Sequence, residues 1–351
     1  MEKRMNIIMW LKNWIHSFFH YKHRRLPTAQ FKKIDYPFGK EPAKHSAVNV
    51  DCLDSSWCPL MLERDYIAWL LDVEFLTSQP LSNSETEALT IFEHMVTSRK
   101  TMAQMLPRLP AIIPQLMRSL KDDNISSAQL AQQIARDPVL VGEVIGLANT
   151  PYYRRSHKIT SIEQAVLLLG QNGLRQLVSR VAFYPILNIN SRTMTRLNGA
   201  RLWQQSEHCA LICRKIAELE KTDSFAAYLA GLVSNVGLLA GLRIMDELFT
   251  TKATSLSHSW AFYQVFITLA KRLSYSIVTE WGFPKAVTQA LFEQTDNHLL
   301  TMQTLLGQIL TAGDRYSKLY ILNIHQRMPK TTDAQDIINH PCYRQFCNDT
   351  Y

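Results

Sequence analysis

Apolar residues recur at helical spacing, every third or fourth position, along most of the chain. No run of residues alternates between apolar and polar in the way that a half-buried strand requires. The pattern therefore predicts an all-α fold. The predicted helices span 5–19, 60–76, 84–99, 174–186, 197–219, 224–234, 238–249, 259–281, 284–293 and 299–320.

Local signals predict where several of these helices begin and end. Within residues 125–130, Ser126 and Gln129 have the spacing of a capping box, with apolar residues on either side as its hydrophobic staple. A second capping box lies in Ile159-Thr-Ser-Ile-Glu163, and the helix that it opens is expected to end at Gly170. Two further boundaries are predicted at Asp137-Pro138 and at Trp281-Gly-Phe-Pro284.

The first fifty residues form a basic arm. They carry ten Lys and Arg against three Asp and Glu, so +7 of the chain's net charge of +8 lies there. The helix predicted at 5–19 has an apolar face that includes Trp10 and Trp14, and its polar face is basic. Residues 1–25 are therefore suited to an anionic membrane surface, or to docking on the protein's own body or on a partner, and disorder is the remaining alternative. Residues 26–50 contain three prolines without periodicity, which indicates a linker.

The composition excludes several classes of function. The chain has 351 residues, 46% apolar and 19% charged, as in a globular protein. Outside the arm the charge is near zero, so no nucleic-acid binding is expected, and only 12 glycines argue against Gly-rich phosphate loops. The six cysteines form no C-x-x-C pair, which indicates reduced cytoplasmic thiols. The predicted location is the cytoplasm, with the arm able to hold the protein at the inner membrane.

Ten short motifs follow one another in order: Leu106-Pro-Arg-Leu-Pro110, Ile134-Ala-Arg-Asp-Pro138, Leu147-Ala-Asn149, Ile159-Thr-Ser-Ile162, Ala165-Val-Leu-Leu-Leu-Gly170, Gly173-Leu-Arg175, Leu202-Trp203, Ala230-Gly-Leu232, Gly237 and Trp281-Gly-Phe-Pro284. The ordered set resembles the HDOD family, the HD-related output domain, across about residues 100–295. The resemblance implies an all-helical domain with a role in bacterial signal transduction. We expect Asn149 to end a helix in the left-handed conformation and Gly231 to allow close backbone approach. The predicted organisation is an arm and linker (1–50), an N-terminal helical segment (51–100), an HDOD domain (101–295), and a C-terminal helix and tail (296–351).

The resemblance also implies where a metal site would be. The ancestral HD fold is a phosphohydrolase that holds divalent metal with His and Asp side chains, and the metal activates water. In this chain the first His slot falls on Gln205, the His-Asp pair on Ser234-Asn235, the next His on Ala270, and the last His pair on Glu293-Gln294. Glu293 is the only strong oxygen ligand among these. We therefore predict a protein with no metal, no cofactor and no catalytic residue.

The residues at these slots, together with His208 one helical turn from Gln205, are termed the vestigial pocket. It is either a hydrogen-bonding pocket for a ligand such as a nucleotide, or a polar cluster whose members satisfy one another inside the core. His208 shares its helix with Cys209 and Cys213, which fits either a metal site or plain packing. The vestigial pocket comprises Gln205, His208, Ser234, Asn235, Ala270, Glu293 and Gln294.

A basic aromatic tetrad, Tyr152, Tyr153, Arg154 and Arg155, follows a predicted helix end. It is suited to contact a partner or a phosphate, or it is a loop with partly packed rings. The leading hypothesis is a non-catalytic signal-transduction protein that binds an unidentified signalling protein. A small-ligand or nucleotide sensor and a residual metal-dependent phosphodiesterase remain the alternatives. The tail 329–351 gives no prediction beyond a short helix or loop.

Overall fold

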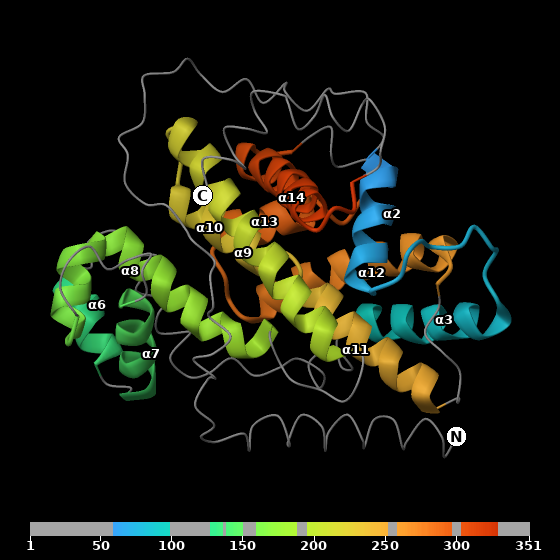
Figure 1. Cartoon of the computed structure of the whole chain (residues 1–351), viewed down its shortest axis with the longest axis horizontal. Helices are drawn as coiled ribbons and strands as arrows, with labels where there is room; N and C mark the ends of the chain where they lie inside the picture. Colours follow the sequence, from blue (N-terminus) through green and yellow to red (C-terminus); the bar gives the residue numbers. More distant parts are fainter. Residues whose placement is uncertain are drawn as a thin grey trace.

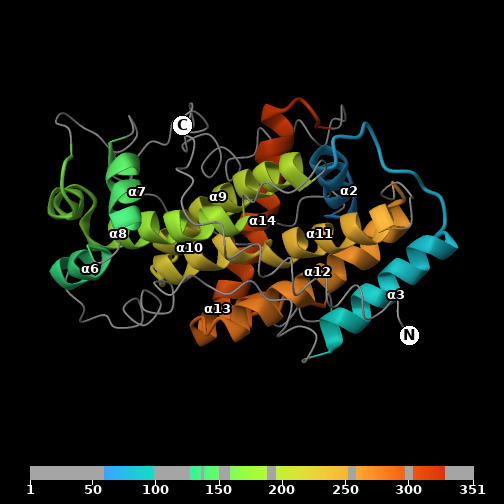
Figure 2. The ribbon, with the colours of Figure 1, turned by 90° about the horizontal axis from the view of Figure 1, so that it is seen from below.

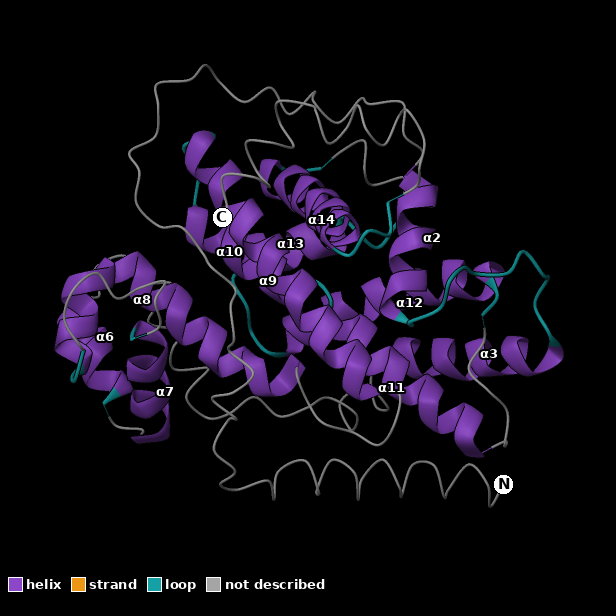
Figure 3. Ribbon diagram, in the orientation of Figure 1, coloured by secondary structure: helices purple, strands orange, loops and turns teal. Residues whose placement is uncertain are grey.

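The computed structural model describes residues 59–98, 127–135, 138–149, 159–187, 195–251, 258–296 and 303–328. Every regular element within these ranges is a helix, and the β-type contact recorded there is an isolated bridge between Thr77 and Ser259. Figure 3 shows this helical architecture, which confirms the predicted all-α fold. The helices are α2 (Pro59–Leu70), α3 (Asn83–Thr97), α6 (Ser127–Ile134), α7 (Pro138–Ala148), α8 (Ile162–Leu187), α9 (Thr195–Leu219), α10 (Ser224–Val233), α11 (Val236–Thr251), α12 (Trp260–Glu280), α13 (Lys285–Phe292) and α14 (Leu305–Ile324).

Helix α9 forms the centre of the molecule, with α10 and α14 packed along it (Figure 1). Helices α11 and α12 pack on each other, and α13 contacts α10, α12 and α14. The backbones of α9 and α10 approach closely at Gly231, where a Cβ would lie 2.7 Å from the Cα and N of Ala210. Only glycine fits such a contact, as expected for Gly231. These six helices form the frame that positions the candidate site.

Helices α6 and α7 pack against α8 and lie at one end of the molecule in both ribbon views (Figures 1 and 2). Helix α8 breaks at Gly170, whose φ of 65° lies in the left-handed region, at the predicted helix end. Helix α7 ends before Asn149 as predicted, but the Asn149 side chain, and not a left-handed backbone, caps the end. The Asn149 amide donates to the carbonyls of Ile145 (2.9 Å) and Ile159 (2.6 Å) and accepts from the Ile159 N–H (2.7 Å), while its backbone stays outside the left-handed region. The expected left-handed conformation was wrong because the side chain, not the backbone, satisfies the helix end.

The N-terminal helical segment, described at residues 59–98, packs on the same body. Helix α2 contacts α14 and α9, and α3 contacts α12 and α11. The Thr77 N–H donates to the His258 carbonyl (2.8 Å), and the Trp260 N–H donates to the Thr77 carbonyl (2.9 Å). Arg201 of α9 donates to the Trp69 carbonyl at the end of α2 (2.5 Å). Residues 59–98 therefore help to build the site described below.

Two helices differ in extent from their predictions. The helix predicted at 60–76 ends at Leu70, because Asp72 takes a φ of 62°, which a continuing helix cannot accommodate. The helix predicted at 299–320 begins at Leu305 and continues to Ile324, since the Thr304 hydroxyl accepts the Gly307 N–H (3.2 Å) and caps its start.

The second predicted capping box forms, but its acceptor side chain comes from the residue after the expected one. The Ser161 hydroxyl accepts the Gln164 N–H (3.3 Å), and the Thr160 N–H donates to the Gln164 side chain (2.8 Å), so Gln164 takes the place expected for Glu163. Several predictions fall outside the described residues: the arm at 1–50, the caps at Ser126 and Asp137, the tetrad at 152–155 and the tail at 329–351.

One helical stretch among the described residues, Ser224–Asp246, is long and apolar enough to cross a membrane by length and composition. It combines α10 and α11, and 83% of its most apolar window is buried inside the protein. A core helix has the same properties, so the stretch is weak support for a membrane span.

Candidate functional site

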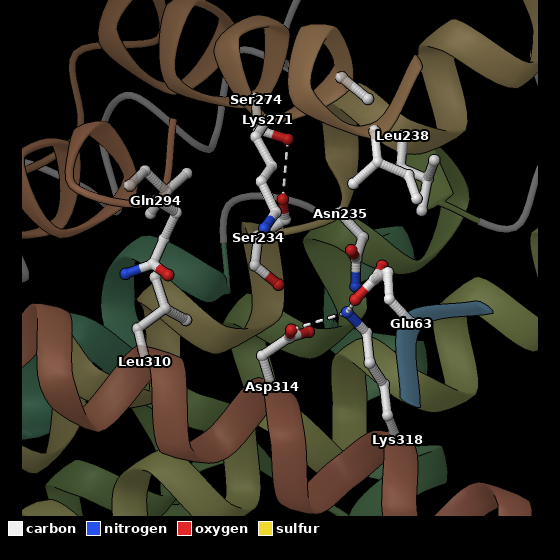
Figure 4. A pocket seen from close by; sticks show the side chains of 13 residues that line it. Glu63, Ser234, Asn235, Leu238, Lys271, Ser274, Gln294, Leu310, Asp314 and Lys318 are labelled. Carbon is white, nitrogen blue, oxygen red and sulfur yellow. Dashed lines mark hydrogen bonds and ion pairs between the residues drawn. The ribbon is translucent and has the colours of Figure 1, made fainter. Parts of the chain in front are cut away.

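A cavity of about 50 Å³ opens where α10, α11, α12, α13, α14 and α2 meet. Four residues of the vestigial pocket line it: Ser234, Asn235, Ala270 and Gln294. The wall also contains charged residues that the sequence analysis did not select (Figure 4). They are Glu63 on α2, Lys271 on α12, and Asp314 and Lys318 on α14. We term this space the central cavity.

A serine on α12 holds the break between α10 and α11, where two lining residues sit. The Ser274 hydroxyl donates to the Ser234 carbonyl (2.7 Å) and accepts the Gly237 N–H (2.9 Å). The Ser234 hydroxyl in turn donates to the Gly231 carbonyl (2.9 Å). These bonds satisfy backbone groups at the helix junction and fix Ser234 and Asn235 beside the cavity.

A chain of side-chain amides runs from the cavity wall into the core. The Asn235 amide N–H donates to the Gln205 side-chain oxygen and to the Ser206 hydroxyl (3.3 Å). The Gln205 amide N–H donates to Asp314 Oδ1 (3.0 Å) and to the Ser317 hydroxyl (3.0 Å). Gln205 is fully buried. The residues at the first His slot and at the Asp slot are thus bonded to each other and to Asp314.

A buried lysine joins two carboxylates at the other side of the cavity. Lys318 Nζ lies 2.7 Å from Glu63 Oε2 and 2.7 Å from Asp314 Oδ2, and the Lys318 side chain is 4% exposed. Burial lowers the pKa of Lys318, but the charges of Asp314 and Glu63 outweigh it and raise the pKa above the usual value. The ammonium also lies 5.1 Å from the centre of the Tyr66 ring. Lys318 is therefore a charged residue under all ordinary conditions.

Glu293 lies in the vestigial pocket by sequence, but it does not line the cavity. Its Oε2 accepts from the N–H and the hydroxyl of Thr304 (3.0 Å each), and its Oε1 accepts from the Gln289 amide (3.0 Å). The carboxylate thus supports the first turn of α14, where a negative charge is favourable. All its oxygens have structural partners.

His208 also lies away from the cavity wall. Its ring packs on Tyr320 with centroids 4.7 Å apart, and burial, with a smaller contribution from the charge of His325, lowers its pKa to about 4. Cys209 and Cys213 are buried with their sulfurs 3.9 Å apart, and the Cys213 thiol donates to the Ile309 carbonyl (3.6 Å). The hydrogen bond with Cys213, followed by burial, raises the pKa of Cys209. A neutral imidazole and buried thiols favour the packing interpretation of this helix.

The donor set does not fit the divalent metal that an HD-type site implies. The cavity presents hydroxyls, amides and an alanine at the former ligand slots, and Lys318 already pairs with both nearby carboxylates. Among the described residues, no group of three or more His, Cys, Asp or Glu is arranged to hold a metal ion. A catalytic metal needs ligands that offer lone pairs without a competing cation.

Sequence reasoning missed Glu63, Asp314, Lys318 and Lys271. Asp314 and Lys318 have the i, i+4 spacing of an ion pair, yet that spacing is common on solvated helix faces. Glu63 pairs with Lys318 across 255 residues, for which the sequence offers no local signal.

The described residues thus define a class of protein with an all-helical body and a polar cavity at the junction of α10 and α11. The chain belongs to the HDOD family, because the HDOD domain profile matches residues 106–297, more than half of its length. Glu63, Asp314 and Lys318 flank that match on either side, so the chain completes the cavity with residues from beyond it.

Two solved structures are similar in fold. An HDOD domain protein of unknown function from Geobacter sulfurreducens has a TM-score of 0.53 at 20% identity, covering 76% of this chain and 90% of that one. A protein of Shewanella amazonensis SB2B, proposed to be a metal-dependent phosphohydrolase, has a TM-score of 0.52 at 17% identity, covering 77% and 100%. At these identities the likeness shows the fold alone.

A curated relative, an uncharacterized protein of Treponema pallidum (strain Nichols), is 21% identical over 180 residues. The match covers 51% of this chain and 34% of that protein, so the chain spans about a third of the length of the curated relative it matches.

Proposed function

We propose that this HDOD protein is a non-catalytic regulatory module of signal transduction that acts by binding another protein. The observation that carries the proposal is the hydrogen-bonded set of Asn235, Gln205 and Asp314, which uses the residues at former ligand slots to satisfy one another. A polar cluster that is closed in this way stabilises the core and leaves few groups for chemistry. Protein binding is then the function that the helical body can still perform.

The proposal excludes catalysis because of the side chains that stand where metal ligands would be needed. Metal-assisted phosphoester hydrolysis requires an ion that lowers the pKa of a bound water. Ser234, Asn235 and Ala270 offer one hydroxyl, one amide and one methyl group where such an ion would need imidazole or carboxylate. The only carboxylates on the described wall of the cavity, Glu63 and Asp314, both pair with Lys318.

The size of the cavity argues against the nucleotide-sensor alternative. At about 50 Å³ it is far below the ~300–1,000 Å³ of ordinary small-molecule pockets. A nucleotide would need the helices around Ser274 and Leu310 to separate. The regulatory-module proposal requires no such rearrangement.

Assays with full-length protein and Mn²⁺ test the catalytic part of the proposal. A generic phosphodiester such as bis(p-nitrophenyl) phosphate should be hydrolysed no faster than in a matched reaction with the Asp314→Asn variant. Hydrolysis that depends on the protein, on Mn²⁺ and on Asp314 would establish the phosphodiesterase alternative instead.

Crosslinked capture from the native cells tests the binding part. The expected result is one reproducible protein partner for the whole chain, and its loss in a Trp10→Ala/Trp14→Ala variant would place the contact on the arm. An Leu167→Ala variant is the control, since Leu167 is 86% exposed on α8 and lies far from the arm in sequence. Recovery of lipid alone, dependent on the two tryptophans, would make the arm a membrane anchor and remove its role in partner binding.

Purified components must then reproduce the interaction. The captured protein should bind the whole chain in isolation, with the same response to the tryptophan substitutions. If no protein is captured by any variant, the binding proposal is wrong.

A further inference from the structure

The central cavity already holds a cation that belongs to the chain. Lys318 Nζ is 2.7 Å from one oxygen of Glu63 and 2.7 Å from one oxygen of Asp314. The two oxygens therefore lie within 5.4 Å of each other and contact the same ammonium. Figure 4 shows the Lys318 nitrogen meeting the Asp314 and Glu63 carboxylates, with the Asn235 side chain beside them.

Two carboxylates at this separation suit a divalent ion as well as an ammonium. Hard ions such as Mg²⁺ and Ca²⁺ bind carboxylate and amide oxygens at roughly 2.0–2.6 Å, and Mn²⁺ prefers the same donors. Even at the full separation, the two oxygens would need to approach each other by only about 0.2–1.4 Å to hold such an ion at these distances. Asn235 lies on the same wall, and its side-chain oxygen is a donor of the same hard type.

The cavity also provides the water that such an ion needs. Divalent ions in oxygen sites commonly keep several water ligands. A volume of about 50 Å³ accommodates about three to five water molecules, when each needs roughly 10–15 Å³. What prevents binding is the ammonium itself, because it neutralises both carboxylates and fills the space between them.

We propose that Lys318 is a tethered substitute for a metal ion: its ammonium occupies a latent divalent-cation site formed by Glu63 and Asp314 and keeps metal out of the cavity. The site adjoins the slots that the family resemblance implies, since Asp314 is bonded to Gln205 and Asn235 lies on the same wall. The new element is Lys318 as the occupant, together with Glu63, and both come from helices outside the matched family region. The same ammonium ties α2 to α14 in place of a bridging ion. The lysine thus links the two segments that flank the family domain.

Mn²⁺ titration followed by the paramagnetic resonance signal of the free ion tests this inference in the full-length protein. Wild-type protein should bind no Mn²⁺ in the millimolar range. The Lys318→Met variant, which keeps an unbranched apolar side chain, should bind one equivalent with a dissociation constant of about 10⁻⁴–10⁻³ M, as in weak oxygen-ligand sites. Its melting temperature should rise with added Mn²⁺, because the ion binds the folded state.

Two further variants make the test specific. Lys271→Met removes another ammonium from the same cavity without freeing a carboxylate pair, so it should bind no Mn²⁺. Lys318→Met/Asp314→Asn should lose the site that Lys318→Met gains. Equal Mn²⁺ binding by wild type and Lys318→Met, or a folded Lys318→Met variant that binds no more than Lys271→Met, would overturn the inference.

Failure of Lys318→Met to fold is also informative. Refolding in the presence of Mn²⁺ should then restore the helical circular-dichroism signal, and no recovery at millimolar Mn²⁺ counts against the inference. The outcome is separable from the proposed function. Binding of Mn²⁺ by wild type would refute the role of Lys318 but leave the regulatory module standing, unless the bound ion also hydrolyses a phosphodiester.

Discussion

The Gln205 amide donates to the Asp314 carboxylate at 3.0 Å and joins α9 to α14 across 109 residues of sequence. Because Gln205 also accepts from Asn235, one buried side chain on α9 joins α14 to the junction between α10 and α11. An imidazole at position 205 would offer only two nitrogens, whereas the amide donates two hydrogens and accepts through its oxygen. Gln205, where the family resemblance implies the first metal ligand, is therefore well matched to a structural role.

Gln205→Ala should destabilise the folded state by about 2–4 kcal/mol. It leaves an amide of Asn235 and an oxygen of Asp314 without these partners and creates a cavity in a fully buried position. Urea unfolding followed by circular dichroism measures the change. The control is Gln132→Ala, at an exposed position of α6, which should stay within about 0.5 kcal/mol of wild type. A loss below 1 kcal/mol for Gln205→Ala would show that the amide chain contributes little.

His208 should make the protein less stable as the pH falls. Burial lowers its folded-state pKa to about 4 from the ordinary value of 6.5, so the unfolded chain binds a proton first. The stability that the neutral ring provides is complete above pH 6.5 and is lost progressively as the pH falls towards 4. The expected loss is about 3 kcal/mol, at about 1.4 kcal/mol for each pH unit.

Unfolding curves between pH 7 and 4.5 for wild type and His208→Phe isolate this effect from the titration of carboxylates. The phenyl ring keeps the aromatic contact with Tyr320 and carries no proton. The pH dependence should be flatter in the variant. Identical slopes would mean that His208 does not titrate in this range.

The helices could be predicted from sequence because their signals are local. The break of α8 at Gly170 and the stop at Trp281-Gly-Phe-Pro284, where Gly282 has a φ of 71°, depend on backbone conformations that glycine favours. The end of α2 could not be predicted in this way. Asp72 takes a φ of 62°, although its residue type gives only a weak preference for that conformation.

The candidate site was predictable only in part, for the same reason. The family pattern brought together Ser234, Asn235, Ala270 and Gln294, which do share one cavity. It placed Glu293 among them, but Glu293, one residue before Gln294, directs its carboxylate towards Thr304. The contact between Lys318 and Glu63 depends on how α2 docks on α14, and long-range docking leaves no trace in residue spacing.

Alanine substitution should change the free energy of unfolding in opposite directions at two glycines. Gly231→Ala would force a Cβ to within 2.7 Å of the α9 backbone and should destabilise the protein by more than about 2 kcal/mol. Gly142→Ala places its Cβ where nothing lies within 4 Å, inside α7, and should stabilise by about 0.5–1 kcal/mol through helix propensity. Thermal unfolding of both variants measures the pair. Equal effects would contradict the close packing of α9 and α10.

Substitutions of Glu293 distinguish a structural carboxylate, which affects stability, from a cation ligand, which affects Mn²⁺ binding. Glu293→Ala removes the acceptor for the Thr304 N–H and hydroxyl at the start of α14, so it should cost about 1–3 kcal/mol of stability. Glu293→Gln retains one acceptor oxygen and should cost less. Because the carboxylate does not line the cavity, neither substitution should alter Mn²⁺ binding by the Lys318→Met variant. Combining each with Lys318→Met and repeating the titration and the urea unfolding distinguishes the roles. A change in Mn²⁺ affinity with unchanged stability would place Glu293 in the cation site and contradict its assignment as the support of α14.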